Sequence, residues 1–244
     1  MKRYFKYIGA LLMTILLLSA CKKDYYQDGG IHDPKFNGTI MDFLESRPEL
    51  FDTLVRIVKI AGLEPTLENE EITFFAPPNA SIGKTLRSLN RNLYLDGRDT
   101  VVELEQIKPS VWKHFLGMYM MRDKYILKDF PQLDTLNMIA FPGQIYLTYN
   151  DEPMNVGVIY NDVITTNSEG VKQIVKYAGY RQLHISSMNS FSISGLGVAP
   201  VATSDIQPHN GSVHVLQFSK HGFGFNNRDF IDKVYATGVS PRTN

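Results

Sequence analysis

Cysteine is almost absent from this sequence, because Cys21 is the only one among the 244 residues. A single thiol forms no internal disulfide, and beyond residue 21 there is no thiolate for a metal site or for nucleophilic catalysis. The folded part must therefore be stabilised by its own hydrophobic core. Its length and apolar content are sufficient for one large domain or two small ones.

An excess of charge of either sign is also missing. The chain carries 25 basic and 25 acidic residues, for a formal net charge of zero, and it has no long block of like charges. Proteins that bind nucleic acids usually cluster lysine and arginine on one face. We therefore expect no nucleic-acid partner.

Motifs of the common enzyme classes are lacking too. There is no Gly-x-Ser-x-Gly nucleophile elbow, and the glycine-rich stretch Ser194–Gly197 lacks the lysine of a phosphate-binding loop. Paired carboxylates for glycoside cleavage cannot be recognised from spacing alone. The sequence therefore predicts a protein that is not an enzyme and needs no cofactor, with a hydrolase as the less favoured alternative.

The N-terminus does carry a pattern. Three basic residues precede the apolar run Ile8–Leu18, which is too short to cross a bilayer and is typical of a signal peptide, here residues 1–20. The stretch from Leu18 to Cys21 resembles the lipobox of bacterial lipoproteins. This resemblance implies cleavage before Cys21, a diacylglycerol on its thiol and a membrane anchor; the alternative is an ordinary signal peptide with an incidental cysteine. We expect the outer membrane of a Gram-negative bacterium, with exposure at the cell surface left open.

A polar leash and two helices are predicted next. Residues 21–36 combine the lipidated cysteine with a turn-rich tether that has no apolar periodicity. A short amphipathic helix follows Thr39. The spacing of Ser46 and Glu49 predicts a capping box for a second helix, with Pro48 in its first turn and Gly62 as its stop.

The stretch Ile72–Ile82 reads as a strand, a proline corner and the start of a helix capped by Asn79. Its pattern Thr-x-Phe-Ala-Pro-x-Asn resembles the first signature segment of fasciclin (FAS1) domains. The matching residues are Thr73, Phe75, Ala76, Pro77 and Asn79.

A second segment, Val201–Phe218, resembles the closing segment of the same family, whose core pattern is Asn-Gly-x-x-His-Val. Asn210 and Gly211 form a tight-turn dipeptide before a strand that contains His214. Between the two segments, a helix with His114 and a hairpin from Asp134 also follow the family order. The resemblance implies an α+β fold, a single wedge in which a β-sandwich is packed with helices, over residues 37–219, followed by a C-terminal extension at 220–244.

The predicted domain is longer than the family scaffold requires. We place the main insertion, a hairpin region, at about residues 150–180, with a polar turn at Thr166–Gly170, and a smaller excess at 90–105. Long excursions on a rigid scaffold often carry binding sites. Each signature occurs once, so no second fasciclin unit is expected.

The resemblance implies a binding or adhesion function with an extracellular protein ligand. In some members an Asp-Ile pair just before the closing motif makes the contact, and Asp205 and Ile206 match it. A second adhesive element, a tyrosine beside the central histidine, is absent because Lys113 precedes His114. The competing interpretation of Asp205 and Ile206 is structural, with the aspartate bracing a turn and the isoleucine in the core.

The alternative function is glycan capture. Tyrosines cluster around the inserted region, and exposed aromatic rings can stack on sugars. Tyr160 and Tyr177 are the candidate residues, although strand tyrosines are equally common. His209, His214 and His221 invite a zinc interpretation, but their spacing matches no ligand pattern, so we expect no metal site and structural roles for His114 and His214.

Overall fold

The computed structural model describes residues 33–188 and 197–241. Within these ranges the chain divides into two units: residues 161–180 form one, which we call the hairpin unit, and the remaining residues form the main unit. The expected signal peptide, Cys21, the tether up to residue 32 and most of Ser194–Gly197 lie outside the described residues.

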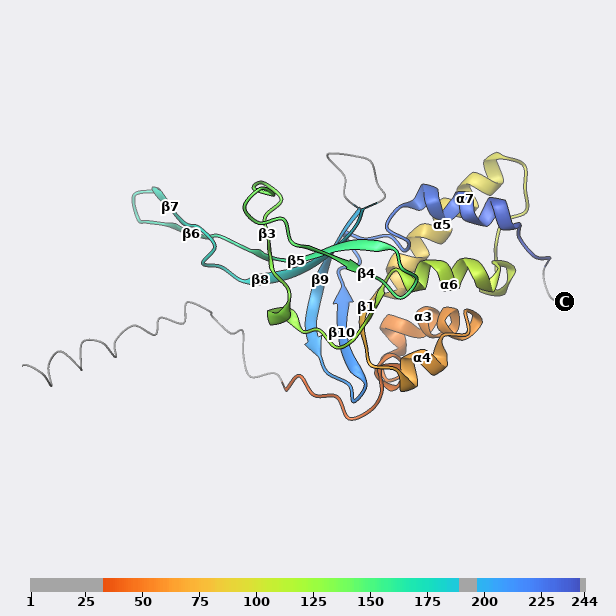
Figure 1. Cartoon of the computed structure of the whole chain (residues 1–244). Helices are drawn as coiled ribbons and strands as arrows, with labels where there is room; N and C mark the ends of the chain where they lie inside the picture. Colours follow the sequence, from red (N-terminus) through yellow and green to blue (C-terminus); the bar gives the residue numbers. More distant parts are fainter. Residues whose placement is uncertain (1–32, 189–196, 242–244) are drawn as a thin grey trace, which may run out of the picture. The chain divides into compact units, whose positions relative to one another are not determined.

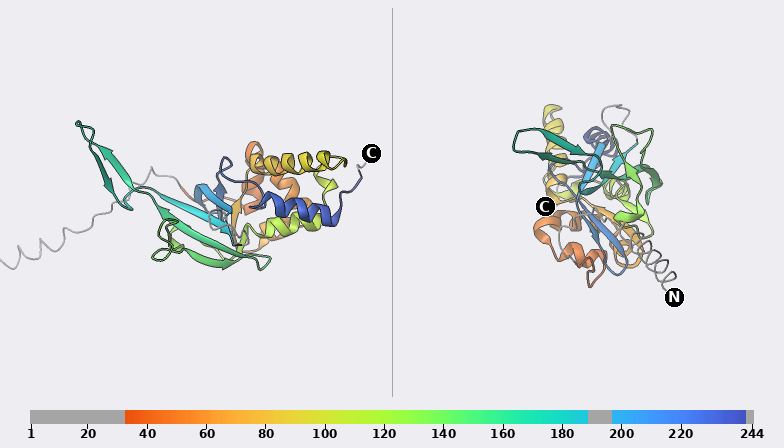
Figure 2. Two further views of the ribbon diagram at one scale, coloured as in Figure 1. Left: turned by 90° about the horizontal axis from the view of Figure 1, so that it is seen from above. Right: turned by 90° about the vertical axis from the view of Figure 1, so that its left-hand side faces the viewer.

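The main unit contains both helices and a sheet, and the helices gather at one end of it (Figures 1 and 2). The helices are α2 (Ile40–Glu45), α3 (Pro48–Ile60), α4 (Glu64–Asn69), α5 (Asn79–Leu95), α6 (Pro109–Gly117) and α7 (Asn227–Thr237), with short 3-10 turns η1 (Leu104–Gln106) and η2 (Leu127–Asp129). No helix among the described residues is both long and apolar enough to span a membrane.

The start of the fold follows the predicted helices but not the predicted cap. The capping box forms at Thr39, whose side chain accepts from the Asp42 N–H while the Asp42 carboxylate accepts from the Thr39 N–H. The box predicted at Ser46 is wrong, because Ser46 ends α2 and its hydroxyl donates to the Phe43 carbonyl at 2.7 Å. Pro48 is the first residue of α3, as expected.

One sheet of eight strands organises the main unit, in the order β2-β1-β10-β9-β8-β5-β3, with β4 also beside β5. The strands are β1 (Ile72–Ala76), β2 (Met120–Arg122), β3 (Gln132–Leu133), β4 (Gln144–Leu147), β5 (Pro153–Tyr160), β8 (Arg181–Ser187), β9 (Gly197–Ile206) and β10 (Gly211–Leu216). The sheet curls, and the Tyr149 N–H just after β4 donates to the Met120 carbonyl in β2 at 2.8 Å. The α+β class is confirmed, with its β-structure as one curled half-barrel.

The hairpin expected from Asp134 differs in its pairing. Strands β3 and β4 both pair with β5, β3 in parallel and β4 antiparallel, and Leu133 of β3 forms a single bridge with Pro142, just before β4. The connection between β3 and β4 is therefore a long loop at the edge of the sheet.

The core lies between the helices and the sheet. Its largest buried side chains include Phe51 of α3, Phe74 of β1 and Trp112 of α6. Helix α7 adds Phe230, whose ring lies 5.5 Å from that of Trp112. The segment 220–244, expected as an extension, thus contains a helix that is part of the core.

The excursion placed at about 150–180 has two parts. Strand β5 belongs to the main sheet and pairs with β8 from Met154 opposite Ser187 to Tyr160 opposite Arg181. The hairpin unit follows β5 and contains β6 (Val163–Thr166) and β7 (Lys172–Val175), which pair with each other. The chain therefore leaves and re-enters the main sheet at two residues that face each other.

Candidate functional site

The two signature segments lie side by side in the sheet. Strand β1 runs parallel to β10, with Ile72 opposite Gly211 and Phe75 opposite His214. A side chain at Gly211 would collide with the Ile72 carbonyl oxygen, so only glycine fits there. Thr73 donates to the Asp123 carbonyl at 2.8 Å and accepts from the Tyr125 N–H at 2.7 Å, which fixes the loop after β2.

The proline corner also has a defined geometry. Phe75, Ala76 and Pro77 are buried. Asn79 is the first residue of α5 and not its cap, so the predicted capping role is wrong. Its side-chain oxygen instead accepts from the Thr53 N–H at 3.0 Å and ties the start of α5 to α3.

His214 is fully buried in the middle of β10, and both ring nitrogens have partners. Nε2 lies 3.1 Å from the Tyr125 carbonyl, and Nδ1 lies 3.3 Å from the Asp205 N–H. Because a carbonyl only accepts and an N–H only donates, the proton is on Nε2. Burial lowers the pKa of His214 to about 4. The imidazole is therefore neutral at pH 7, and its 3.9 Å approach to the Asp205 carboxylate is not an ion pair.

Asp205 and Ile206 lie at a bulge in β9, which has one residue more than β10 between their flanking pairs. Asp205 has a φ of 64°, and its Oδ1 accepts from the Leu127 N–H at 2.7 Å. Ile206 is half-buried and contacts the core. A groove of about 320 Å³ beside it is lined by Phe36, Phe43 and Leu50 among others. The Asp205 carboxylate thus braces the loop at Leu127.

His114 lies on α6, half-buried, with its ring edge-on to Phe115 at 4.9 Å. Burial, with the nearby Lys233, lowers the pKa of His114. The side chain of Asn150 donates to its backbone carbonyl at 2.9 Å. This contact joins α6 to the turn after β4.

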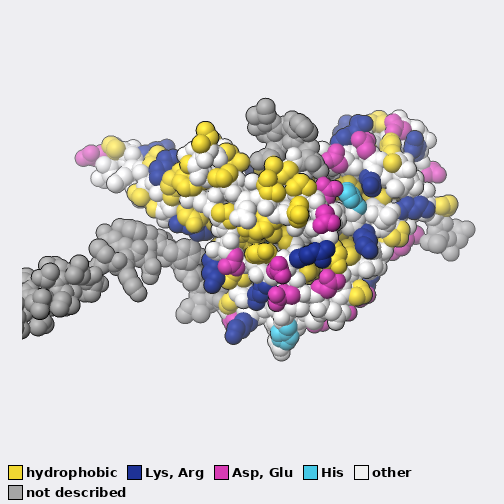
Figure 3. All heavy atoms as spheres, viewed as in Figure 1, with side chains coloured by type: hydrophobic (Ala, Val, Ile, Leu, Met, Phe, Trp, Pro, Cys, Tyr) yellow, Lys and Arg dark blue, Asp and Glu magenta, His cyan; other side chains and the backbone are white. Residues whose placement is uncertain are grey.

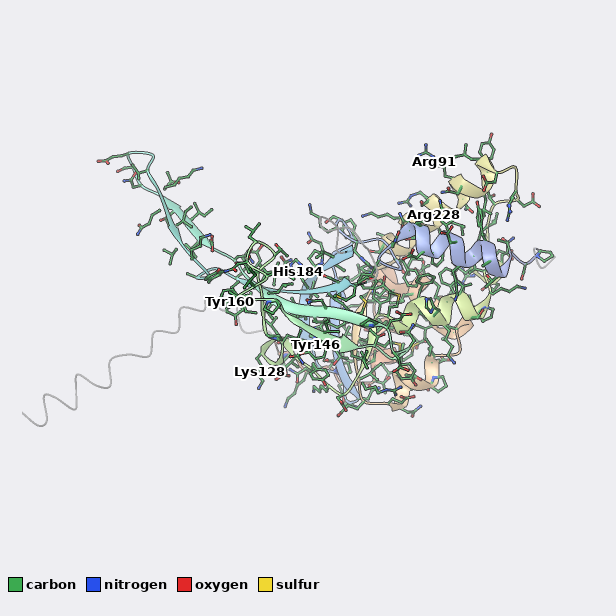
Figure 4. All side chains as sticks on the ribbon, turned by 45° about the horizontal axis from the view of Figure 1, so that its top comes forward. Arg91, Lys128, Tyr146, Tyr160, His184 and Arg228 are labelled. Carbon is green, nitrogen blue, oxygen red and sulfur yellow. The ribbon has the colours of Figure 1, made fainter. Side chains whose placement is uncertain are left out.

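The tyrosines form no common stacking surface within the main unit. The ring of Tyr146 on β4 packs against Tyr125 and Phe130, and Tyr160 at the end of β5 is covered by the Arg181 guanidinium at 3.6 Å (Figure 4). Tyr177 belongs to the hairpin unit, where its φ is 58° and its N–H donates to Asp162 Oδ1. The ring partners of Tyr146, and the guanidinium over one face of Tyr160, reduce the aromatic area that is open to a sugar.

An exposed group of apolar side chains, which we call the apolar face, lies on the β3–β4 loop and on β4. It consists of Leu136, Met138, Ile139, Ile145 and Leu147. Leu136 is 94% exposed, Ile139 100% and Leu147 63%. Figure 3 shows hydrophobic side chains gathered over this part of the main unit. Scattered exposed apolar residues are normal on a protein surface, whereas larger exposed apolar patches often coincide with interaction sites.

Sequence reasoning missed the apolar face, although a signal was present. From Gln132 to Asn150 the only charged residue is Asp134. An uncharged run of this length could equally be buried, and only the structure shows that its apolar side chains point outward.

A comparison with known protein families shows to which family the chain belongs. The fasciclin domain model matches residues 49–217, which is most of the chain. The chain belongs to the fasciclin domain family. Among solved structures it is similar to a FAS1 domain pair from the insect cell adhesion molecule fasciclin I, with 17% identity and a TM-score of 0.44 over 73% of this chain. The match spans about half, 49%, of that chain. No curated protein gives a significant match.

Members of the fasciclin family are typically adhesion or binding modules. In this fasciclin domain, no group of three or more histidine, cysteine or acidic residues that could hold a metal occurs within the described ranges. His209 is exposed, His214 serves the β9–β10 bulge and His221 contacts Tyr119. The described site residues therefore consist of motif residues held by hydrogen bonds and of an exposed group of apolar side chains.

Proposed function

We propose that this protein is a non-enzymatic adhesion module of the fasciclin type, anchored to the outer membrane through a lipid on Cys21, which binds a protein partner through the apolar face. The observation that carries this proposal is the nearly complete exposure of Leu136 and Ile139 at the sheet edge. Family membership supports a binding role, and the lipobox-like stretch supports the anchor.

The chemistry of the apolar face favours a protein partner. A polysaccharide is bound mainly through hydrogen bonds and open aromatic rings, and an anionic membrane surface through lysine and arginine. The apolar face has apolar side chains, and Asp134 is the only charged residue in the stretch from Gln132 to Asn150 that carries it. An apolar centre that excludes water is what protein interfaces use for affinity.

Asp205 and Ile206 contribute less to this proposal than sequence alone would favour. The carboxylate of Asp205 is already used on the Leu127 N–H, and Ile206 is half-buried. Glycan capture through Tyr160 and Tyr177 is the alternative outcome of the test.

The experiment begins with a photo-crosslinking amino acid at Ile139 in living cells. A discrete protein adduct is expected there and not at Leu95, an exposed apolar residue at the end of α5. The partner identified in this way is then purified and its affinity for each variant is measured by calorimetry. A glycan array with the same protein examines the alternative.

Leu136→Ser with Ile139→Ser should weaken binding at least tenfold, because each side chain loses about 1 to 3 kcal/mol of apolar burial at the interface. Leu95→Ser is the matched control and should bind normally. Both variants should keep the thermal transition of the parent, since the changed side chains are exposed. Equal binding by all three proteins, or binding to glycans only, would contradict the proposed surface.

The anchor is tested separately. Cys21→Ser should leave the protein unprocessed or move it out of the membrane fraction, because two or three acyl chains at about 0.8 kcal/mol per CH₂ hold a protein firmly on a bilayer. Fractionation and acyl labelling unchanged from the parent would refute the lipid anchor without affecting the apolar face.

A further inference from the structure

A pocket of about 590 Å³ lies between the start of α5 and the start of α7. None of its described lining residues belongs to the apolar face. Its lining includes Lys84, Lys220, His221, Phe225, Asn226 and Asn227. We call it the His221 pocket. None of its described lining residues is acidic, and no described salt bridge involves either lysine.

His221 is 4% exposed, and one of its ring nitrogens forms a hydrogen bond with a buried tyrosine. Nε2 lies 2.7 Å from the Tyr119 hydroxyl, which itself accepts from the Gly224 N–H at 2.7 Å. A hydroxyl has one proton to donate, and a buried donor is rarely left unused. Tyr119 therefore donates to Nε2.

This assignment places the imidazole proton on Nδ1. Burial, with the charge of Lys84 nearby, lowers the pKa of His221 to about 3, so the ring is neutral at pH 7. Nδ1 has no hydrogen-bond partner among the described residues, while His221 lines the pocket. This Nδ1–H is not among the fully buried unpaired polar atoms, so the ring offers an accessible donor at the pocket that it lines.

The surroundings of this donor are positive. The Lys84 ammonium donates to the Phe218 carbonyl, a neutral acceptor, which leaves donors for a second partner. Lys220 also lines the pocket. Helix α7 begins there at Asn227, and the N-terminal end of a helix adds a partial positive charge, while Asp229 in the first turn of α7 does not line the pocket.

We propose that the His221 pocket binds the oxyanion group of a small ligand, a carboxylate, sulfate or phosphate, with the His221 Nδ1–H as a fixed donor and Lys84 and Lys220 supplying the charge. Charge-assisted hydrogen bonds to an oxyanion are about twice as strong as neutral ones. The neutral imidazole fixes the direction of one hydrogen bond to the oxyanion, and it adds no charge that would have to be buried. The pocket volume accommodates an acidic monosaccharide as well as a free ion.

The test is calorimetry with the full chain in detergent, using sodium sulfate, sodium phosphate, sodium glucuronate and uncharged glucose at constant ionic strength. At least one anion should bind with one-to-one stoichiometry, and glucose should not. The three anions distinguish a tetrahedral ion from a sugar carboxylate. Absence of binding by every anion, or equal binding of glucose, would overturn the proposal.

Variants locate the binding. Lys84→Gln should weaken the anion about tenfold, whereas Lys113→Gln, an exposed lysine on α6 outside the pocket, should not. His221→Phe removes the Nδ1–H and should abolish binding, with its thermal transition recorded to establish folding. Equal affinity in Lys84→Gln and Lys113→Gln would overturn the site.

Nitrogen NMR examines His221 directly, without any variant. The proton should be found on Nδ1 in the free protein. The Nδ1 resonance should shift as anion is added, and the affinity derived from this titration should equal the affinity measured by calorimetry. A proton on Nε2, or a resonance unchanged at saturation, would overturn the role of His221.

Discussion

His214 and His221 are close in the sequence and both are buried and neutral, but the protein uses them differently. His214 has partners at both nitrogens, the Tyr125 carbonyl and the Asp205 N–H. His221 has the Tyr119 hydroxyl at Nε2 and no described partner at Nδ1, beside a positively charged pocket. A histidine whose two ring nitrogens both have protein partners stabilises the framework. A histidine with a partner at one nitrogen can also donate a hydrogen bond to a ligand.

The largest expected effect concerns the framework. His214→Ala should lower the free energy of unfolding by about 3 to 5 kcal/mol, because it opens a cavity and leaves two backbone groups unpaired. Denaturant unfolding measures this loss. His209→Ala, at an exposed position, is the control and should change stability by less than about 0.5 kcal/mol. A loss below 1 kcal/mol at His214 would show that the framework does not depend on this histidine.

Acid should lower the stability of the fold through both histidines. The pKa of His214 is lowered to about 4 and that of His221 to about 3, whereas both return to about 6.5 on unfolding. The unfolded chain therefore binds more protons, and stability should fall as the pH drops from about 6.5 towards 4, by up to about 1.4 kcal/mol per pH unit for each histidine. Unfolding curves at pH 7, 6, 5 and 4 measure the slope, which should be shallower in His214→Ala. A flat profile would contradict the buried neutral state.

Tyr119→Phe tests how the His221 ring is held in place. The change should cost about 1 to 3 kcal/mol, because the buried Gly224 N–H and His221 Nε2 lose their partner while the ring stays in place. Thermal and denaturant unfolding provide the measurement, with Tyr94→Phe on the exposed part of α5 as the control. Equal stability of both variants would mean that the Tyr119 hydroxyl does not fix the imidazole.

Asp205→Asn should have the smallest effect. Burial raises the pKa of Asp205, so the charged form is disfavoured in the folded state and its penalty grows as the pH rises through the folded pKa. Asparagine tolerates the φ of 64° and can still accept from the Leu127 N–H. Stability at pH 7 should be equal to or slightly above that of the parent, with the advantage shrinking in acid. A loss above about 1 kcal/mol at pH 7 would show that the carboxylate charge is required.

The framework was largely predictable from the sequence, whereas the open sites were not. The strand with His214 follows from its sequence pattern and is confirmed, whereas the turn lies one residue earlier than predicted, at His209 and Asn210, and Gly211 begins β10. The caps at Ser46 and Asn79 failed because each side chain has a competing partner nearby in the fold. The apolar face and the His221 pocket depend on which side chains are left uncovered after packing, and one-dimensional patterns do not contain that information.

The register of β5 and β8 has a practical consequence. Because Tyr160 and Arg181 face each other across the ladder, the intervening residues begin and end about 5 Å apart. A foreign domain whose own termini are similarly close could replace residues 161–180 with little change in closure entropy and no change in strand register. The position is thus suited to grafting a reporter or an antigen onto this scaffold.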